Sequence, residues 1–182
     1  MKVLFFLLDT VFFFLIGAAL LRGWMNTRRM RMTQQPGVFV MAVTDWIVGP
    51  VRRTLPKALA QANADWGSFM AALLLALMYS LVVHLIVGGQ MPGVSNLGYT
   101  WTIPWVAVIF MLRTVLQGVM VLALVYAVLS WVQPHSPVHG VLSRLLDPVL
   151  APIRRFVPTI GGVDLSVLLL IIVLQVGLIL LG

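Results

Sequence analysis

Four long apolar segments constrain the fold of this chain more than any other feature. They cover residues 3–24, 66–88, 105–132 and 164–181, of which the last is the shortest. A helix needs about 20 residues to cross a hydrocarbon core roughly 30 Å thick, because each residue adds about 1.5 Å to its length. Hydrophobic residues make up 61% of the chain and charged residues only 9%, far from the composition of a water-soluble domain. We therefore predict an all-α integral membrane protein with four transmembrane helices.

The distribution of basic residues indicates how these helices are oriented. The loop between the first and second segments contains seven Lys and Arg residues when Arg22 is counted, and the loop between the third and fourth contains three. The middle loop contains none. Basic loops stay in the cytoplasm, so both termini and the middle loop are predicted to lie outside. The basic cluster after the first segment anchors that end in the cytoplasm, which is opposite to the orientation of a secretory signal.

An internal duplication organises the sequence. A D-x4-P-x-R-R-x2-P signature occurs twice, and each of its residues recurs 102 positions later. The residues are Asp45, Pro50, Arg52, Arg53 and Pro56 in the first copy and Asp147, Pro152, Arg154, Arg155 and Pro158 in the second. Self-similarity at a fixed spacing is typical of a repeated structural unit. We predict two parallel repeats of the same topology, at residues 1–90 and 105–182, joined by an external loop at 91–104.

Each signature falls in a segment predicted to lie in the membrane interface as an amphipathic element, at residues 37–57 and 137–158. In the second segment, apolar side chains alternate with Arg154 and Arg155, so apolar groups can enter the interface while guanidinium groups face lipid phosphates. Two interpretations of the arginine pairs stay open: a charge signal bound to anionic lipid, and a docking surface for a cytoplasmic partner. The residues assigned to these roles are Arg52, Arg53, Arg154 and Arg155.

Three aspartates mark predicted helix boundaries. Asp65 and Asp164 each precede a long apolar run, where a carboxylate accepts the free N–H groups of a helix start, so both are predicted to be N-caps. Asp147 precedes Pro148, and a residue before proline is disfavoured in the α conformation. We therefore expect one surface helix to end near Leu146 and a second, short element to follow it.

The second copy carries a specific resemblance. Residues 130–166 contain S-W and then D-P-V-L-A-P-I-R-R-F-V-P-T-I-G-G-V-D-L-S, which is similar to the repeat segment of the YggT/YlmG family of small bacterial and plastid membrane proteins. The resemblance covers essentially the whole chain, although the first copy has a basic insertion at 27–35 and lacks the G-G before Asp65. It implies a multi-pass protein of the bacterial cytoplasmic (inner) membrane. Family members are associated with osmotic stress resistance, septum formation and cell shape, and plastid nucleoid distribution or cytochrome b6f cofactor assembly, none of which supplies a catalytic residue.

Polar side chains also occur inside the predicted spans, where ionisable groups are functional candidates. They are Asp9, His84, Arg113, Gln117 and Gln175, together with Tyr79. A rise of about 1.5 Å per residue places Asp9 about one turn from Arg113 and predicts one polar layer in the outer half. This layer is either a structural cluster with an Asp9–Arg113 pair or part of a water-filled or ion-conducting path. A further alternative is that Arg113 extends to the outer interface and leaves Asp9 to another partner.

Several kinds of chemistry are excluded or disfavoured. The chain has no cysteine, which excludes disulfides, thiolate metal sites and cysteine nucleophiles. His84 has no second ligand at a suitable spacing, and Pro137 separates His135 from His139. No phosphate-binding loop or nucleophile elbow is present. We therefore expect no enzyme activity, no cofactor and no metal site.

The predicted function follows from a duplicated basic surface beside a membrane core with little chemistry. It is a non-enzymatic scaffold or assembly factor in envelope homeostasis, osmotic stress resistance or cell division. The alternative is a small oligomeric ion or osmolyte channel or transporter that uses the outer-half polar layer. Expected partners are anionic phospholipids, a membrane or cytoplasmic protein, and further copies of the chain. Direct nucleic-acid binding is not expected, because the basic residues lie between apolar spans.

Overall fold

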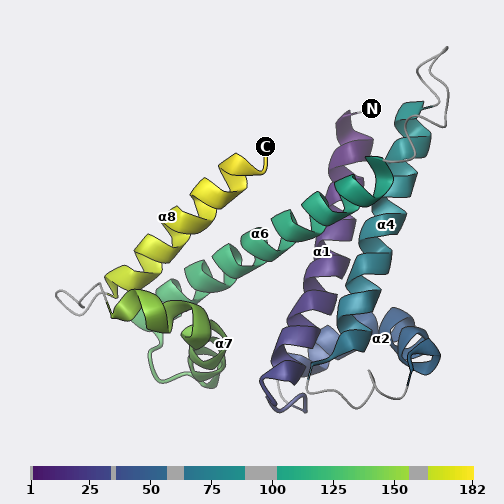
Figure 1. Cartoon of the computed structure of the whole chain (residues 1–182). Helices are drawn as coiled ribbons and strands as arrows, with labels where there is room; N and C mark the ends of the chain where they lie inside the picture. The colour runs from purple at the N-terminus through teal and green to yellow at the C-terminus, as the bar shows by residue number, and fades with distance from the viewer. Residues whose placement is uncertain (1, 34–35, 57–63, 89–101, 156–163) are drawn as a thin grey trace. The chain divides into compact units, whose positions relative to one another are not determined.

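The computed structural model of the chain describes residues 2–33, 36–56, 64–88, 102–155 and 164–182. These residues form helices and no strand (Figure 1). The helices are α1 (Lys2–Thr27), α2 (Gly37–Thr54), α4 (Trp66–Gly88), α6 (Thr102–Val132), α7 (Pro137–Arg154) and α8 (Leu165–Leu180). The prediction of an all-α fold is therefore confirmed for the part of the chain that the structure describes.

Three of the helices are long and apolar enough to cross a membrane. They are Lys2–Thr27, Trp66–Val87 and Thr102–Val132, and they coincide with the first three predicted spans. The fourth predicted span corresponds to α8, which is equally apolar but has only 16 residues. Residues 91–101 of the predicted external loop (91–104) lie outside the described residues, and its last three residues belong to α6.

The chain divides into two compact units, Met1–Thr114 and Val115–Gly182. The dividing point falls inside α6, so the beginning of this helix belongs to unit 1 and the remainder to unit 2. Unit 1 otherwise contains α1, α2 and α4, and unit 2 contains α7 and α8. Each unit thus combines apolar helices with one amphipathic helix.

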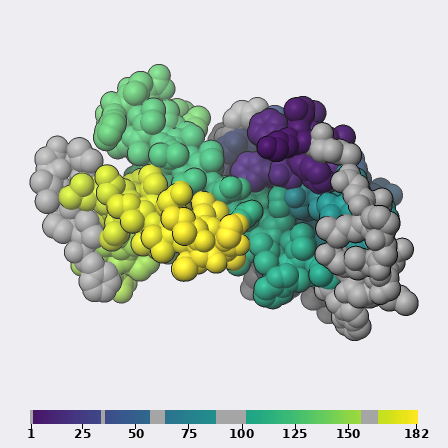
Figure 2. Space-filling view, turned by 90° about the horizontal axis from the view of Figure 1, so that it is seen from above, coloured from purple at the N-terminus to yellow at the C-terminus, as the bar shows by residue number. Residues whose placement is uncertain are grey.

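Close packing of α1 against α4 forms the core of unit 1. In the space-filling view, the purple atoms of α1 lie against the teal atoms of this unit (Figure 2). Small side chains allow the approach, since Ala19, Ala72 and Ala76 are completely buried. At Gly23 a Cβ atom would lie 3.2 Å from the ring of Phe69. Without a hydrophobic driving force between helices in lipid, this kind of close contact is what holds two apolar helices together.

The amphipathic helix α2 packs across the adjacent ends of α1 and α4. Its buried residues are Gly37, Val40, Thr44 and Val48. Their spacing of three or four residues places them on one side of a helix. The opposite side is exposed, and Pro50 lies on it.

In unit 2, α7 runs as a single helix from Pro137 to Arg154. It begins with a cap, because the side chain of Ser136 accepts a hydrogen bond from the His139 N–H at 3.1 Å. The expected end of this helix near Leu146 is wrong: Pro148 and Pro152 both lie inside it.

The physical reason is the position of the two prolines. A proline inside a helix removes the hydrogen bond to the carbonyl four residues earlier. Here those carbonyls belong to Arg144 and Pro148, which lie on the exposed side of the helix. Solvent can therefore replace the missing N–H donors. On the other side, burial of Leu142, Leu145, Leu146 and Leu150 continues without interruption. Burial of these leucines therefore stabilises the helix by more than Pro148 and Pro152 destabilise it.

Candidate functional site

In unit 1, the carboxylate of Asp65 joins three helices. Its Oδ1 accepts the backbone N–H of Ser68 at 3.2 Å, which confirms the predicted N-cap of α4. Its Oδ2 accepts hydrogen bonds from the Ser68 hydroxyl at 2.7 Å and from Asn26 Nδ2 at 3.0 Å. The guanidinium of Arg52 donates to the same oxygen and forms an ion pair. Side chains from α1 and α2 thus converge on the first turn of α4.

In unit 2, Asp164 occupies the equivalent position. Its Oδ1 accepts the backbone N–H of Ser166 at 3.0 Å, which confirms the predicted N-cap of α8. Its Oδ2 accepts from Arg154 Nε at 3.0 Å and from Arg154 Nη2 at 2.8 Å. Arg154 Nη2 also donates to the hydroxyl of Tyr126 on α6 at 3.2 Å, and the Tyr126 ring stacks on His139 at a centroid distance of 4.9 Å. Three helices again meet at one aspartate.

We call these two ion pairs, Arg52–Asp65 and Arg154–Asp164, the arginine clasps. Their arginines are the repeat-related residues, 102 positions apart. Burial alone would raise the pKa of each aspartate, but the hydrogen bonds outweigh it: Ser68, Asn26 and Arg52 lower the pKa of Asp65, and Arg154 and Ser166 lower that of Asp164. Both carboxylates therefore remain charged partners for their arginines at neutral pH.

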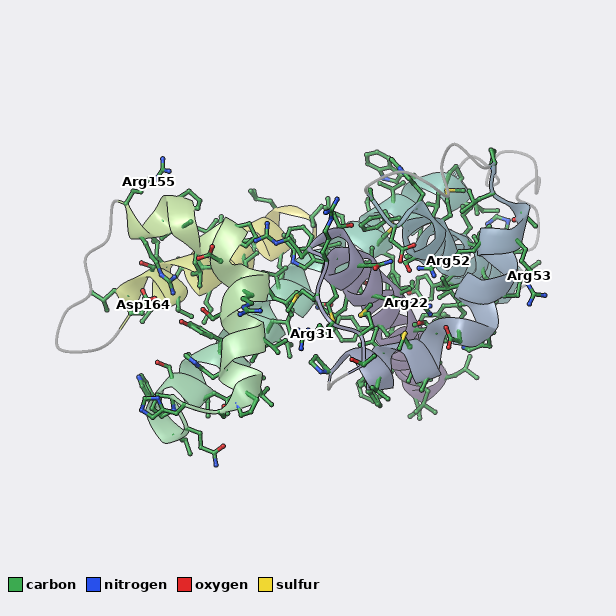
Figure 3. The ribbon with its side chains drawn as sticks, turned by 90° about the horizontal axis from the view of Figure 1, so that it is seen from below. Arg22, Arg31, Arg52, Arg53, Arg155 and Asp164 are labelled. Carbon is green, nitrogen blue, oxygen red and sulfur yellow. The ribbon has the colours of Figure 1, made fainter. Side chains whose placement is uncertain are left out.

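The second arginine of each pair is placed differently. Arg53 and Arg155 are exposed, and the described part of the chain offers neither guanidinium group a hydrogen bond or ion pair (Figure 3). Arg52 and Arg154 stabilise the fold, whereas Arg53 and Arg155 are available for contacts outside it. The two arginines of each pair therefore have separate roles, which the sequence interpretation treated as one.

The sequence itself indicates this difference between the two arginines of each pair. Arg52 follows the buried Val48 by four residues, and Arg154 follows the buried Leu150 by four. Residues four apart lie on the same side of a helix, so the first arginine of each pair lies on the side of the buried residues, although Arg52 itself is partly exposed. The expectation of a helix end near Leu146 concealed this relationship.

The aspartates of the signature itself differ between the copies. Arg22 is buried near the end of α1 and donates to Thr44 Oγ1 at 2.9 Å and to Asp45 Oδ1 at 2.7 Å. The second copy has no arginine at that place, and Asp147 lies 3.8 Å from Arg154 Nη1 instead. The sequence predicts for Arg22 only a contribution to membrane topology. Arg22 also fixes α2 against α1.

The remaining signature residues are prolines. Pro50 and Pro152 lie on exposed sides inside α2 and α7, and Pro56 follows the end of α2. Pro158 lies outside the described residues.

Part of the predicted outer polar layer is present in unit 1. The Tyr79 hydroxyl donates to Asp9 Oδ1 at 2.7 Å. The Tyr79 ring stacks on Phe110 with centroids 3.9 Å apart and is tilted against Phe12 at 5.5 Å. Among the described residues no ion pair joins Asp9 to Arg113, so the predicted neutralising pair is replaced by a bond to tyrosine. Asp9 nevertheless remains exposed beside this bond.

The other members of that layer are distributed over both units. His84 is half-buried on α4, and Arg113 is half-buried on α6. Gln117 and Gln175 belong to unit 2, where Gln175 lies on an exposed face of α8. Within the described ranges no group of three His, Cys, Asp or Glu side chains is arranged to hold a metal ion. The contact between Asp9 and Tyr79 is therefore the feature that the structure adds to the polar layer.

These features define a duplicated, all-helical protein with apolar, membrane-compatible helices, in which each copy is closed by an arginine clasp. A model of the CCB3/YggT family matches residues 1–86 and 105–182. The chain belongs to this family, as the resemblance of the second copy predicts.

Individual relatives agree with this assignment. The chain is 35% identical to the "Uncharacterized protein YggT" of Escherichia coli K12 over 178 residues, which are 97% of this chain and 87% of the relative. It is 31% identical to the "Uncharacterized protein in proC 3'region" of Vibrio alginolyticus, covering 97% of this chain and 92% of the relative. An uncharacterized protein of Haemophilus influenzae is 26% identical, with coverage of 85% and 78%. No solved structure matches the chain.

Proposed function

We propose that this protein is a non-enzymatic scaffold or assembly factor of the bacterial cytoplasmic membrane, acting in envelope homeostasis, osmotic tolerance or cell division. It would cross the membrane four times, with both termini outside and α2 and α7 on the inner side. The short α8 extends about 24 Å, most of a hydrocarbon core of roughly 30 Å. The basic residues that flank α2 and α7 support this orientation.

The proposed docking surface is the exposed side of α7, which faces away from the rest of unit 2. Arg144, Asp147 and Arg155 are exposed there, opposite the buried leucines. The helix contains no Phe, Tyr or Trp. Without aromatic residues this surface lacks the usual anchors of a membrane interface. Its two signs of charge suit electrostatic recognition of a protein partner.

The observation that carries this proposal is the contrast between Arg154 and its neighbour. Arg154 is fixed by Asp164 and Tyr126, whereas Arg155 is exposed next to it without a partner in the described part of the chain. Arg155 is therefore an exposed charge at the end of α7, directly after an arginine that is held by Asp164 and Tyr126. Electrostatic recognition by a partner with a complementary acidic patch would use such a group.

The test is a double variant, Arg144→Ala/Arg155→Ala, in a strain that lacks the chromosomal copy. Chemical crosslinking in intact membranes and growth after an osmotic upshift are compared with the unmodified chain. The matched control is Arg28→Ala/Arg31→Ala, which also removes two exposed arginines. We expect the double variant on α7 to lose a specific crosslinked protein and osmotic tolerance while the control keeps both. If the two variants behave like the unmodified chain, the docking proposal is wrong.

A channel or transporter is the second candidate, and the Asp9–Tyr79 contact favours it. A carboxylate that is hydrogen-bonded on one side and exposed on the other is suited to meet a cation or a second copy of the chain. Reconstituted vesicles loaded with an ion-sensitive dye test this idea. Ion flux that disappears with Asp9→Asn supports a channel, and absence of flux under any ionic or osmotic gradient argues against it.

A further inference from the structure

The outer side of α2 differs in character from that of α7. Phe39, Trp46 and Arg53 are seven residues apart and exposed, with 51% and 58% of the two aromatic residues accessible. Seven residues are close to two helical turns, so these side chains form a line along the helix, which we call the aromatic stripe. The positions 102 residues later on α7 are Val141, Pro148 and Arg155, without an aromatic side chain.

Two ion pairs fix the level of α2 relative to the candidate spans. Asp45, in the middle of α2, binds Arg22 near the end of α1, and Arg52 at its end binds Asp65 directly before α4. Both anchors mark the same end of the apolar helices. The helix therefore lies at the level where the hydrocarbon core meets the headgroups, not below it.

The aromatic stripe points away from α1 and α4. Residues Val40, Thr44 and Val48 face these helices and are buried, and the stripe occupies the opposite side of α2. In the view from below, α2 lies beside α1, and Arg53 extends outward from unit 1 (Figure 3). The stripe is therefore free to contact whatever surrounds unit 1 at this level.

The polar group of Trp46 does not require water. Its Nε1 donates to the Val43 carbonyl at 2.8 Å, so the indole N–H is satisfied within α2. Buried or lipid-facing tryptophan usually needs a partner for this group. Because Val43 already accepts this hydrogen bond, the indole ring and Phe39 can enter the apolar part of the membrane interface.

Charge on this side of unit 1 favours an anionic surface. Asp45 and Asp65 are each bound by an arginine. In contrast, the described residues provide no carboxylate partner for four exposed arginines: Arg28, Arg29, Arg31 and Arg53. With the two aspartates neutralised, these arginines give this end of unit 1 a net positive charge, which attracts anionic headgroups.

We propose that the aromatic stripe of α2 is a lipid-binding surface, with Phe39 and Trp46 in the acyl–headgroup boundary and Arg53 on the phosphate of an anionic phospholipid. The equivalent side of α7 lies in water. The two repeats therefore have different surfaces, and only α2 presents aromatic side chains to lipid. This inference concerns α2 and does not depend on the docking surface proposed for α7.

Site-directed spin labelling of the full chain tests the environment of the two helices. Because the chain has no cysteine, single labels can be placed at Ala42→Cys on α2 and Arg144→Cys on α7, which are exposed and related by the 102-residue repeat. The protein is reconstituted in vesicles of phosphatidylcholine with a minority of phosphatidylglycerol. We expect the label at 42 to be more accessible to oxygen and the label at 144 to a water-soluble nickel chelate. Nickel accessibility at 42, or protection from both reagents by a covering protein, overturns the proposal.

Lipid selectivity tests the role of Arg53. Spin-labelled phosphatidylglycerol and phosphatidylcholine are compared for association with the reconstituted chain. Arg53→Gln should reduce the preference for phosphatidylglycerol by up to roughly fivefold, the effect of one basic residue near an anionic surface. Arg155→Gln, the repeat-related control, should leave it unchanged. An equal effect of both substitutions, or no effect of Arg53→Gln, contradicts a lipid site on α2.

Discussion

Arg154 donates two hydrogen bonds to a single oxygen of Asp164, from Nε at 3.0 Å and from Nη2 at 2.8 Å. In the other repeat, Arg52 binds Asp65 in the same role. In both copies the amphipathic helix is therefore tied to the cap of the apolar helix that follows it. The clasp explains why the signature contains two adjacent arginines with different surroundings.

Replacement of the clasp arginine should destabilise the protein, whereas replacement of its neighbour should not. Arg154→Ala leaves the partly buried Asp164 without its strongest donor and should lower the free energy of unfolding by about 1–2 kcal/mol. Arg155→Ala removes an exposed side chain and should change it by less than about 0.5 kcal/mol. Thermal unfolding in mild detergent, followed by helical circular dichroism, measures both. Equal effects would show that the clasp does not stabilise the fold.

Gly67 should be required for the clasp in unit 1. A Cβ atom at this position would overlap Arg52 Cγ, so Gly67→Ala must displace the aliphatic part of the arginine side chain that lies against the glycine. We expect a loss of about 1–2 kcal/mol. The loss should be much smaller when Arg52 is already alanine, because the two substitutions act on one contact.

The matched control for this substitution is Gly49→Ala in α2. No atom lies within 4 Å of the added Cβ atom, and alanine is favoured over glycine inside a helix by about 0.5–1 kcal/mol. Gly49→Ala should therefore leave stability unchanged or raise it. Destabilisation by both substitutions to the same extent would indicate a general intolerance of larger side chains rather than a contact with Arg52.

The apolar helices and their caps could be predicted because both depend on local sequence. The run after Asp164 and the ability of a carboxylate to accept free N–H groups suffice to place the start of α8. The clasp could not be predicted in the same way. It depends on α7 continuing through Pro148, and that continuation results from the burial of Leu150 against the rest of unit 2.

The contacts within the outer polar layer could not be predicted from the sequence for a different reason. The rise per residue predicts that Asp9 and Tyr79 lie at a similar depth, and the hydrogen bond between them agrees with this prediction. Depth does not determine the rotation of each helix about its axis. That rotation, set by packing of Phe12 and Phe110 around the Tyr79 ring, directs tyrosine rather than Arg113 to the carboxylate.

The free energy of unfolding should decrease at acidic pH. The reason is that the pKa values of Asp65 and Asp164 are lower in the folded protein than their ordinary value of 3.8. A group with a depressed pKa contributes stability above its unfolded pKa, and this contribution is lost as the pH falls through the folded pKa. Unfolding curves should therefore show a decline below about pH 4. In Asp65→Asn/Asp164→Asn the caps are retained but cannot ionise, so the protein should be less stable at neutral pH and the decline should be smaller. A decline of unchanged size in the double variant would assign it to other groups.

The bond between Tyr79 and Asp9 should stabilise the contact of α4 with α1. Tyr79→Phe removes the hydroxyl that donates at 2.7 Å but retains the ring that stacks on Phe110. Interhelical hydrogen bonds in membranes contribute about 0.6–2 kcal/mol, so a loss within this range is expected in detergent unfolding. Asp9→Asn retains an acceptor and should cost less. In the double variant Tyr79→Phe/Asp9→Ala the losses should not add, because each substitution removes the same bond. Fully additive losses would mean that the two side chains stabilise the protein through separate contacts.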